Sequence, residues 1–167
     1  MFLWSFVAHM ALPIGEAGIR DIPNGQALFA QMSATLGPAA GLYLFPGVKG
    51  ASFDENAKAM AANPSGLLVY RPAGSPFNFP AMLGIELLTQ IIEALIAAFL
   101  LAQTRIASFA GRVGFIALAG VLAAITTNAE YWNWYSFPGL YISAYAGMQL
   151  AGYAVAGLIA AWLVRPN

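Results

Sequence analysis

Three long apolar stretches fill the second half of the chain, and they restrict its fold more than any other feature. The first, Phe79–Ala102, has 24 residues, which as an α-helix would be roughly 36 Å long at 1.5 Å per residue. The second has its apolar centre at 113–127, and the third runs over 140–164. A helix needs about 20 apolar residues to cross a hydrocarbon core about 30 Å thick. We therefore predict three full transmembrane helices.

The composition of the chain agrees with a membrane location. Of its 167 residues, 60% are apolar and only 8% are charged, whereas soluble proteins carry about 25% charged residues to face water. The seven basic and seven acidic side chains cancel, so no positive surface for nucleic acid is expected. The absence of cysteine excludes disulfides, iron–sulfur clusters and thiolate zinc sites. We predict an integral membrane protein with no metal site.

Residues 1–13, "MFLWSFVAHMALP", are apolar but too few to span a bilayer. They have neither the basic region nor the small-residue cleavage site of a signal peptide. We predict a partial first transmembrane helix here, whose start lies upstream or whose span is completed by neighbouring helices. The expected fold is an all-α four-helix transmembrane bundle with a small extracytoplasmic α/β insertion at 14–77, followed by a three-helix transmembrane region at 78–167.

The insertion is expected to have the order helix, strand, helix, strand. Apolar residues at four-residue spacing precede Gly37-Pro38, and "GLYLFPG" and "GLLVYRP" are typical of short strands. Ser52-x-x-Glu55 is the sequence pattern of a helix capping box. The predicted small core consists of Leu28, Met32, Leu42, Leu44, Leu67 and Val69.

The orientation follows from the short connections between the apolar stretches. Arg105 and Arg112 bracket one of them, and Arg165 follows the last stretch on the same side. The other connection, at 128–139, holds Glu130 and no Lys or Arg. Because short loops rich in Lys and Arg remain in the cytoplasm, we expect the C-terminus to be cytoplasmic and the insertion to lie outside.

Glu86, Gln90 and Glu93 are the polar residues that most need an explanation. Spacings of four and three place them on one helical stripe, and an ionised carboxylate at mid-membrane costs about 3 kcal/mol even on insertion scales. We expect the stripe to face other helices of the chain, with His9 or Gln149 among its neighbours. Two interpretations stay open: a proton or cation site, or hydrogen-bonded polar groups that hold helices together.

The remaining candidates carry less chemistry. His9 is the single histidine, so the chain cannot supply both ligands of a bis-histidine haem. His9 is either a hydrogen-bonded residue at a helix end or a lone axial ligand for haem or a chlorophyll. We assign no cofactor. Asn128 and Glu130 could line an outer vestibule beside "YWNWYSFPG", whose aromatic residues are typical of the membrane boundary. In "AGMQLAGYAVAGLIAA", small residues spaced by four predict close helix packing.

"SFVAHMALPIGEAGI", "LLTQIIEALIAAFLLAQT" leading into "GRVGF", and "YWNWYSFP" together resemble a group of small bacterial membrane proteins of four helices with an extracytoplasmic insertion after the first. The resemblance covers most of the chain. It implies this topology and location in the inner membrane, and it implies no activity.

The sequence therefore favours a non-enzymatic inner-membrane protein, an accessory or scaffolding subunit that contacts lipid and other membrane protein subunits. The alternative is a small transporter or a proton- or cation-conducting protein that uses Glu86 and Glu93. A third possibility is a membrane enzyme acting on lipid or quinone, which is supported only by His9, Glu130 and the aromatic connection.

Overall fold

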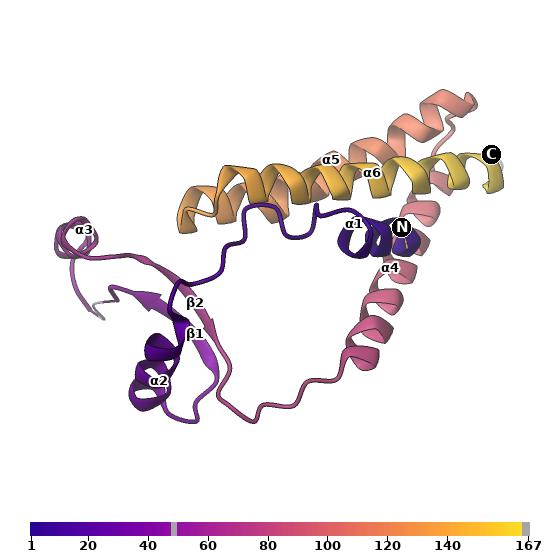
Figure 1. Ribbon diagram of the computed structural model, residues 1–167. Helices are drawn as coiled ribbons and strands as arrows, with labels where there is room; N and C mark the ends of the chain where they lie inside the picture. Colours follow the sequence, from indigo (N-terminus) through magenta and orange to yellow (C-terminus); the bar gives the residue numbers. More distant parts are fainter. Residues whose placement is uncertain (48–49, 165–167) are drawn as a thin grey trace. The chain divides into compact units, whose positions relative to one another are not determined.

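The computed structural model describes residues 1–47 and 50–164 and divides into two compact units (Figure 1). The helical unit comprises Met1–Ile19 and Asn78–Asn167, and the insertion unit comprises Arg20–Phe77. The predicted orientation marker Arg165 lies outside the described residues.

The helical unit contains four α-helices, of which three are long and apolar enough to cross a membrane. Their bounds are α1 Phe2–Met10, α4 Phe79–Ala102, α5 Phe109–Tyr135 and α6 Gly139–Leu163. With nine residues, α1 is roughly 13.5 Å long, which is less than half of a hydrocarbon core. The described chain is thus mostly helical, with three apolar helices and one small sheet, and this is consistent with a helical membrane protein.

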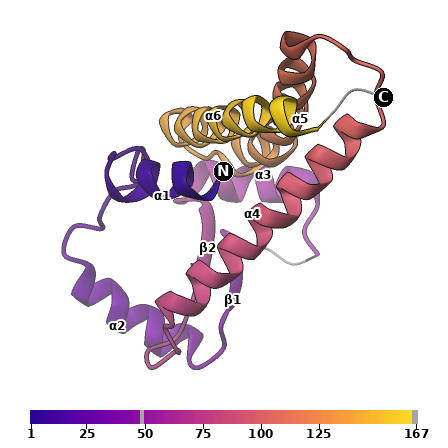
Figure 2. The same cartoon turned by 90° about the vertical axis from the view of Figure 1, so that its right-hand side faces the viewer.

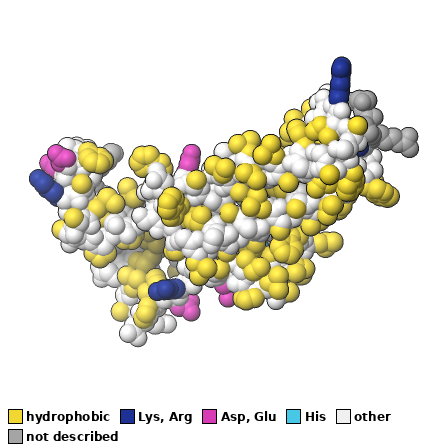
Figure 3. Space-filling model, turned by 90° about the horizontal axis from the view of Figure 1, so that it is seen from above, with side chains coloured by type: hydrophobic (Ala, Val, Ile, Leu, Met, Phe, Trp, Pro, Cys, Tyr) yellow, Lys and Arg dark blue, Asp and Glu magenta, His cyan; other side chains and the backbone are white. Residues whose placement is uncertain are grey.

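Hydrophobic side chains cover much of the face of the helical unit that is seen in Figure 3. On α4, for example, Leu88, Leu95 and Phe99 are each more than half exposed, at 58%, 64% and 63%. Apolar patches of this extent are rare on soluble monomers. Such a surface needs lipid or other protein around it, in agreement with the membrane location.

Helices α5 and α6 pack side by side as an antiparallel pair (Figure 1). Glycines bring the two backbones close together: Gly120 of α5 lies against Tyr153 of α6, and Gly157 of α6 lies against Val113 and Ile116 of α5. The buried residues of α5 recur at every fourth position, as Arg112, Ile116, Gly120 and Ala124. Two residues of this stripe, Ile116 and Gly120, lie against α6.

Helix α1 and the turn that follows it are held on α6 by two hydrogen bonds. The Trp4 Nε1–H donates to the main-chain oxygen of Met148 at 2.8 Å, and the Tyr145 hydroxyl donates to the main-chain oxygen of Gly15 at 3.4 Å. Ala8, on the same short helix, is fully buried. A helix too short to span is therefore anchored by contacts to a neighbouring long helix.

Helix α4 packs against the pair through its C-terminal half. Its buried residues, Ala97 and Leu101, join Ile116 of α5 in the main apolar cluster. Figure 2 shows α4 running obliquely to α5 and α6. The N-terminal half of α4, which carries Glu86, has no buried residue.

The connection between α5 and α6 is shorter than the sequence pattern predicted. The helix does not end near Thr127; it continues to Tyr135, so that Asn128 and Glu130 lie in its last turns. It ends at Ser136, which has a left-handed backbone conformation with φ 55°, and Pro138 precedes the next helix. Aromatic and polar residues at the membrane boundary are compatible with helix as well as with a loop, so their composition does not mark where α5 ends.

The predicted order of elements in the insertion unit, helix, strand, helix and strand, is confirmed. Its elements are α2 Gly25–Leu36, β1 Gly41–Phe45, α3 Phe53–Ala62 and β2 Gly66–Tyr70. The two strands pair antiparallel, with Tyr43 opposite Leu68. The Ser52–Glu55 capping box at the start of α3 is also confirmed, because both of its reciprocal hydrogen bonds are present.

The predicted core of this unit is mostly wrong. The antiparallel register places Leu42 opposite Val69 and Leu44 opposite Leu67 on one face of the sheet, but that face is the open one: Leu42, Leu44 and Val69 are 64%, 61% and 73% exposed. Four of the six predicted core residues are exposed, namely Leu28, Leu42, Leu44 and Val69. The other two, Met32 and Leu67, are half-buried.

The buried side chain of the sheet is Tyr70, which is 7% exposed. Its hydroxyl donates to the main-chain oxygen of Gly37 at 3.0 Å, and the Tyr43 ring lies edge-on to its own, with 6.2 Å between centroids. Both faces of the strands carry apolar or aromatic residues, so an alternating pattern alone could not show which face is covered.

Candidate functional site

The polar stripe of α4 forms as the helical spacing predicted, with a hydrogen bond inside it. The Gln90 side-chain amide donates to a Glu86 carboxyl oxygen at 2.8 Å. Glu86 is exposed, whereas Gln90 and Glu93 are half-buried. The Gln90 amide oxygen is itself buried and has no hydrogen-bond partner within the described part of the chain. The stripe thus keeps unused capacity to accept hydrogen bonds.

The two ends of the stripe have different surroundings. Glu93 lies within electrostatic range of the Tyr153 side chain of α6, and it also interacts with Glu86 on its own helix. Glu86 lies two turns earlier, in the half of α4 without buried residues. The Glu93 end therefore faces the α5–α6 pair, while the Glu86 end remains open. No sequence signal pointed to Tyr153, an aromatic residue among small apolar ones.

His9 and Gln149, the expected neighbours of the stripe, have other hydrogen-bond partners. The His9 Nδ1–H donates to the main-chain oxygen of Ser5 at 2.9 Å, and the imidazole lies edge-on to the Tyr145 ring at 5.9 Å between centroids. His9 is exposed. An Nδ1–H held by a carbonyl leaves Nε2 as the unprotonated nitrogen of the neutral ring.

Gln149 belongs to a second polar cluster, which joins α5 to α6. Its amide oxygen accepts hydrogen bonds from the Thr127 hydroxyl at 3.2 Å and from the Asn128 amide at 3.3 Å. Asn128, predicted for an outer vestibule, is thus part of a helix–helix contact, and Thr127 is a member that the sequence reasoning did not identify. Glu130, two residues after Asn128 on α5, is exposed.

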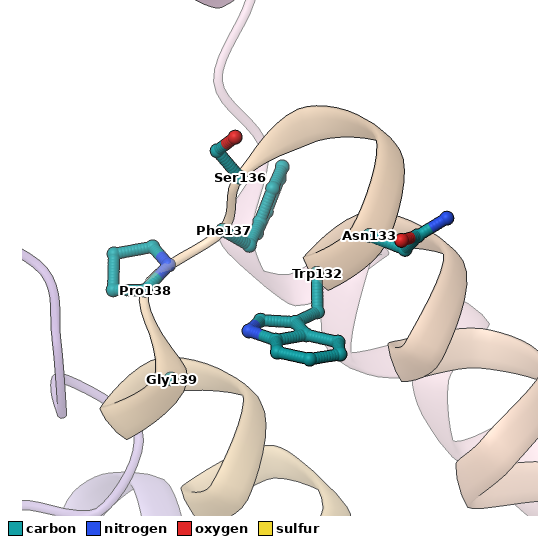
Figure 4. A pocket seen from close by; sticks show the side chains of 6 residues that line it. All are labelled: Trp132, Asn133, Ser136, Phe137, Pro138 and Gly139. Atoms are coloured by element: carbon teal, nitrogen blue, oxygen red, sulfur yellow. The ribbon is translucent and has the colours of Figure 1, made fainter.

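A shallow hollow of about 450 Å³ lies at the turn between α5 and α6 (Figure 4). Its lining consists of Trp132, Asn133, Ser136, Phe137, Pro138 and Gly139. In Figure 4 the Asn133 amide points away from the turn, so the ring of Trp132 and the turn itself form most of the wall. Neither Asn128 nor Glu130 lines this hollow.

Aromatic rings continue from this hollow to α1. Tyr131 contacts Phe137 with 5.1 Å between ring centroids, Phe137 contacts Tyr141 at 5.5 Å, and Tyr141 stacks on Tyr145 at 4.3 Å. Tyr145 then meets His9. Rings of this kind anchor helix ends at the membrane–water boundary, and here they also tie the end of α5 to α1.

Metal ligands do not gather anywhere in residues 1–47 and 50–164, where no group of three or more His, Asp or Glu side chains could hold an ion. The side chains brought together are carboxyls, amides, hydroxyls and aromatic rings. This set can form hydrogen bonds between helices and accept protons or hydrogen-bond donors.

Fold and site together define a helical membrane protein with a polar stripe on its least covered long helix. Comparison of the chain with protein-family models, with curated proteins and with solved structures finds no match.

Proposed function

We propose that this protein is a non-enzymatic accessory or scaffolding subunit of a larger assembly in the bacterial inner membrane, and that α4 is the helix that contacts another membrane protein. The observation that carries the proposal is the open end of the α4 stripe. Glu86 is exposed on a helix apolar and long enough to cross the membrane.

The energetic reason is the unfavourable transfer of polar groups into lipid. A carboxylate deep in the hydrocarbon region costs about 3 kcal/mol on insertion scales, so such residues normally face protein or a wet cavity. Among residues 1–47 and 50–164, Gln90 satisfies one Glu86 oxygen, and the buried Gln90 amide oxygen has no hydrogen-bond partner. A helix of another protein that brings hydrogen-bond donors would cover the exposed Glu86 carboxyl.

The proposal includes an orientation. Arg105 lies in the short connection between α4 and α5, and Arg112 lies in the first turns of α5. This placement supports a cytoplasmic position for the connection by the distribution of positive residues. The insertion unit would then lie outside, and α1 would complete a four-helix arrangement with α4, α5 and α6. Reporter fusions at Ser108 and at Gly74 test the orientation, which is wrong if both report the same side.

A photo-crosslinking experiment tests the role of α4 in native membranes. Benzoylphenylalanine is placed at Thr89, which borders the stripe, or at Leu95, which lies about two and a half turns beyond Glu86 and therefore on the opposite face of α4. Both positions are exposed. We expect a discrete protein adduct from Thr89 that is lost in Glu86→Leu, and only lipid adducts from Leu95. Equal adducts from the two positions would refute a partner on this face.

One observation favours the alternative of a proton- or cation-conducting protein. Glu93 of α4 is half-buried and lies within electrostatic range of Tyr153 of α6, as a proton-carrying carboxyl would be. If this alternative holds, Glu93→Gln abolishes proton or cation flux in proteoliposomes while the fold stays intact. If Glu93 only holds helices together, the same variant leaves any measured flux unchanged.

A further inference from the structure

The insertion unit covers very little of its own apolar surface. Among its described residues, 20–47 and 50–77, Tyr70 alone is buried. Helices α2 and α3 have no buried residue, and the open face of the sheet carries the exposed side chains of Leu42, Leu44 and Val69. A two-stranded sheet is only marginally stable in water unless a further element packs on it. The open face therefore needs a cover from outside the unit.

Helix α2 adds an aromatic ring to this open face. Phe29 and Val69 line one hollow of about 270 Å³, and Val69 lies opposite Leu42 in the sheet. Leu44 continues the same face, because side chains two residues apart on a strand point to the same side. Phe29, Leu42, Leu44 and Val69, all of them exposed, form a continuous surface that we call the apolar patch.

The charge beside the apolar patch is positive. Helix α2 and both strands contain no charged residue. Arg71 follows β2, is exposed, and lines the hollow, whereas no Asp or Glu of the described residues does so. An apolar surface bordered by a cation complements the boundary of a phospholipid bilayer, where acyl chains meet phosphate groups.

The chain enters and leaves the insertion unit at one membrane boundary. Helices α4, α5 and α6 are long and apolar enough to cross the membrane, and two crossings separate the start of α4 from the start of α6. Both starts therefore lie at the same boundary. The insertion unit is followed directly by Asn78, the N-cap of α4. Just before the unit, Gly18 lies against the first turn of α6, where a Cβ would come within 2.7 Å of the Tyr141 main-chain nitrogen.

The two connections to that boundary are short. Residues 20–24 precede α2 and residues 71–78 follow β2; fully extended, they reach at most about 18 Å and about 29 Å. The second is folded rather than extended, because the Arg71 guanidinium donates to the main-chain oxygen of Pro76. A surface tethered this closely meets the bilayer at a high effective concentration, which favours lipid over a freely diffusing protein as its cover.

We infer that the apolar patch rests on the headgroup boundary of the bilayer that the long helices of the same chain enter. The two-stranded sheet has two open edges, which are not tolerated within the hydrocarbon region. The patch therefore reaches only about 5–10 Å into the boundary. This inference concerns the insertion unit and does not depend on the proposed partner of α4.

Hydroxyl-radical footprinting of the wild-type chain, with one copy in each phospholipid nanodisc, tests the inference without any substitution. Phe53 of α3 is the matched control for Phe29: their side chains are 88% and 53% exposed. If both face water, these fractions predict that Phe29 is oxidised about 0.6 times as fast as Phe53. Burial of one phenylalanine favours the docked state by about tenfold or more, so docking predicts about a tenth of the Phe53 rate or less. A ratio of 0.6 or higher would mean that lipid does not cover the patch, and a protein would then be the better candidate.

A fluorescent label in the same nanodiscs measures the depth of the apolar patch. The chain has no cysteine, so Leu44→Cys and the control Lys58→Cys, at an exposed position of α3, each accept a single nitrobenzoxadiazole label. Doxyl-labelled phospholipid should quench the label at position 44, more strongly with the doxyl group near the headgroup than near the chain end. Aqueous iodide should quench the label at position 58 more than the label at position 44. Equal iodide quenching at the two positions, or strongest quenching at position 44 by the chain-end doxyl group, overturns the inference.

Discussion

The contact between Gly120 and Tyr153 gives a quantitative prediction for the α5–α6 pair. A Cβ added at Gly120 would lie 2.5 Å from the Tyr153 Cβ and 2.7 Å from its Cγ. Carbon atoms in contact are at least about 3.5 Å apart, so the helices would have to separate by about 1 Å. Because the nearest atom is the Cβ, which moves only with the backbone, no change of the Tyr153 rotamer can relieve the overlap.

Overpacking of this kind typically costs about 1–3 kcal/mol. Replacing glycine by alanine also improves helix propensity by about 1 kcal/mol, which partly hides the packing effect. Gly114, on the same helix, has open space where its Cβ would be. Gly114→Ala therefore measures the propensity gain alone. At about 2–4 °C per kcal/mol, we expect Gly120→Ala to unfold roughly 2–12 °C below Gly114→Ala.

The measurement is thermal unfolding in detergent micelles, followed by helical circular dichroism and by tryptophan fluorescence. Both variants carry the same substitution in the same helix, so effects of detergent or expression cancel in their difference. Equal Tm values for the two variants would show that α5 and α6 do not approach each other closely at Gly120, and the packing argument would be wrong.

Two further predictions concern α1 and α3. Trp4→Phe removes the donor to the Met148 carbonyl and should lower the stability of the α1 attachment by about 1 kcal/mol. The measurement is hydrogen exchange in α1, which should become faster. Trp162→Phe is the control, because Trp162 is 78% exposed, and it should leave hydrogen exchange in α1 unchanged. Hydrogen bonds from the Ser52 N–H and hydroxyl lower the pKa of Glu55 below its ordinary value of 4.5. The stability that the ionised carboxylate gives α3 is therefore complete above about pH 4.5, and it is lost as the pH falls through the lowered pKa. Ser52→Ala should destabilise α3 by about 1 kcal/mol and should make hydrogen exchange in α3 less dependent on pH between about 3 and 5, and an unchanged pH profile would contradict the role of the cap.

Local signals in the sequence predicted the elements well, because those elements depend on short-range chemistry. The Ser52-x-x-Glu55 pattern specifies a helix start through two reciprocal hydrogen bonds, and these need no tertiary contact. The spacing of Glu86 and Gln90 likewise led to a hydrogen bond within one helix. The end of α5 was not predicted, since it depends on the left-handed backbone conformation of Ser136. A serine in a sequence does not indicate this conformation.

Tertiary placement was predicted less well, because spacing defines a face but not what covers it. Leu42 and Val69 do share a face of the sheet, yet the opposite face, with Tyr70, is the covered one. In the small-residue segment of α6, Gly147 faces open space whereas Gly157 lies against α5, and the tightest contact of the pair is at Gly120 of α5. Which of several small residues meets a neighbour depends on helix rotation, and one sequence does not contain that information.

The two hydrogen bonds that hold α1 to α6 both end on main-chain carbonyls, those of Met148 and Gly15. A carbonyl is present whatever side chain the residue carries. Substitution of Met148 therefore leaves an acceptor for Trp4, although it changes the packing of a buried side chain. Gly15 is restricted for another reason, because a Cβ there would lie 2.5 Å from the His9 ring.

This asymmetry has a consequence for the evolution of the seam between α1 and α6. The donor rings at positions 4 and 145 would be restricted individually, and no paired change at the acceptor positions could compensate for their loss. Co-variation between residues reports spatial contact only where both partners can change together. The α1–α6 seam would therefore leave little trace in paired substitutions among related sequences, even though hydrogen bonds hold it in place.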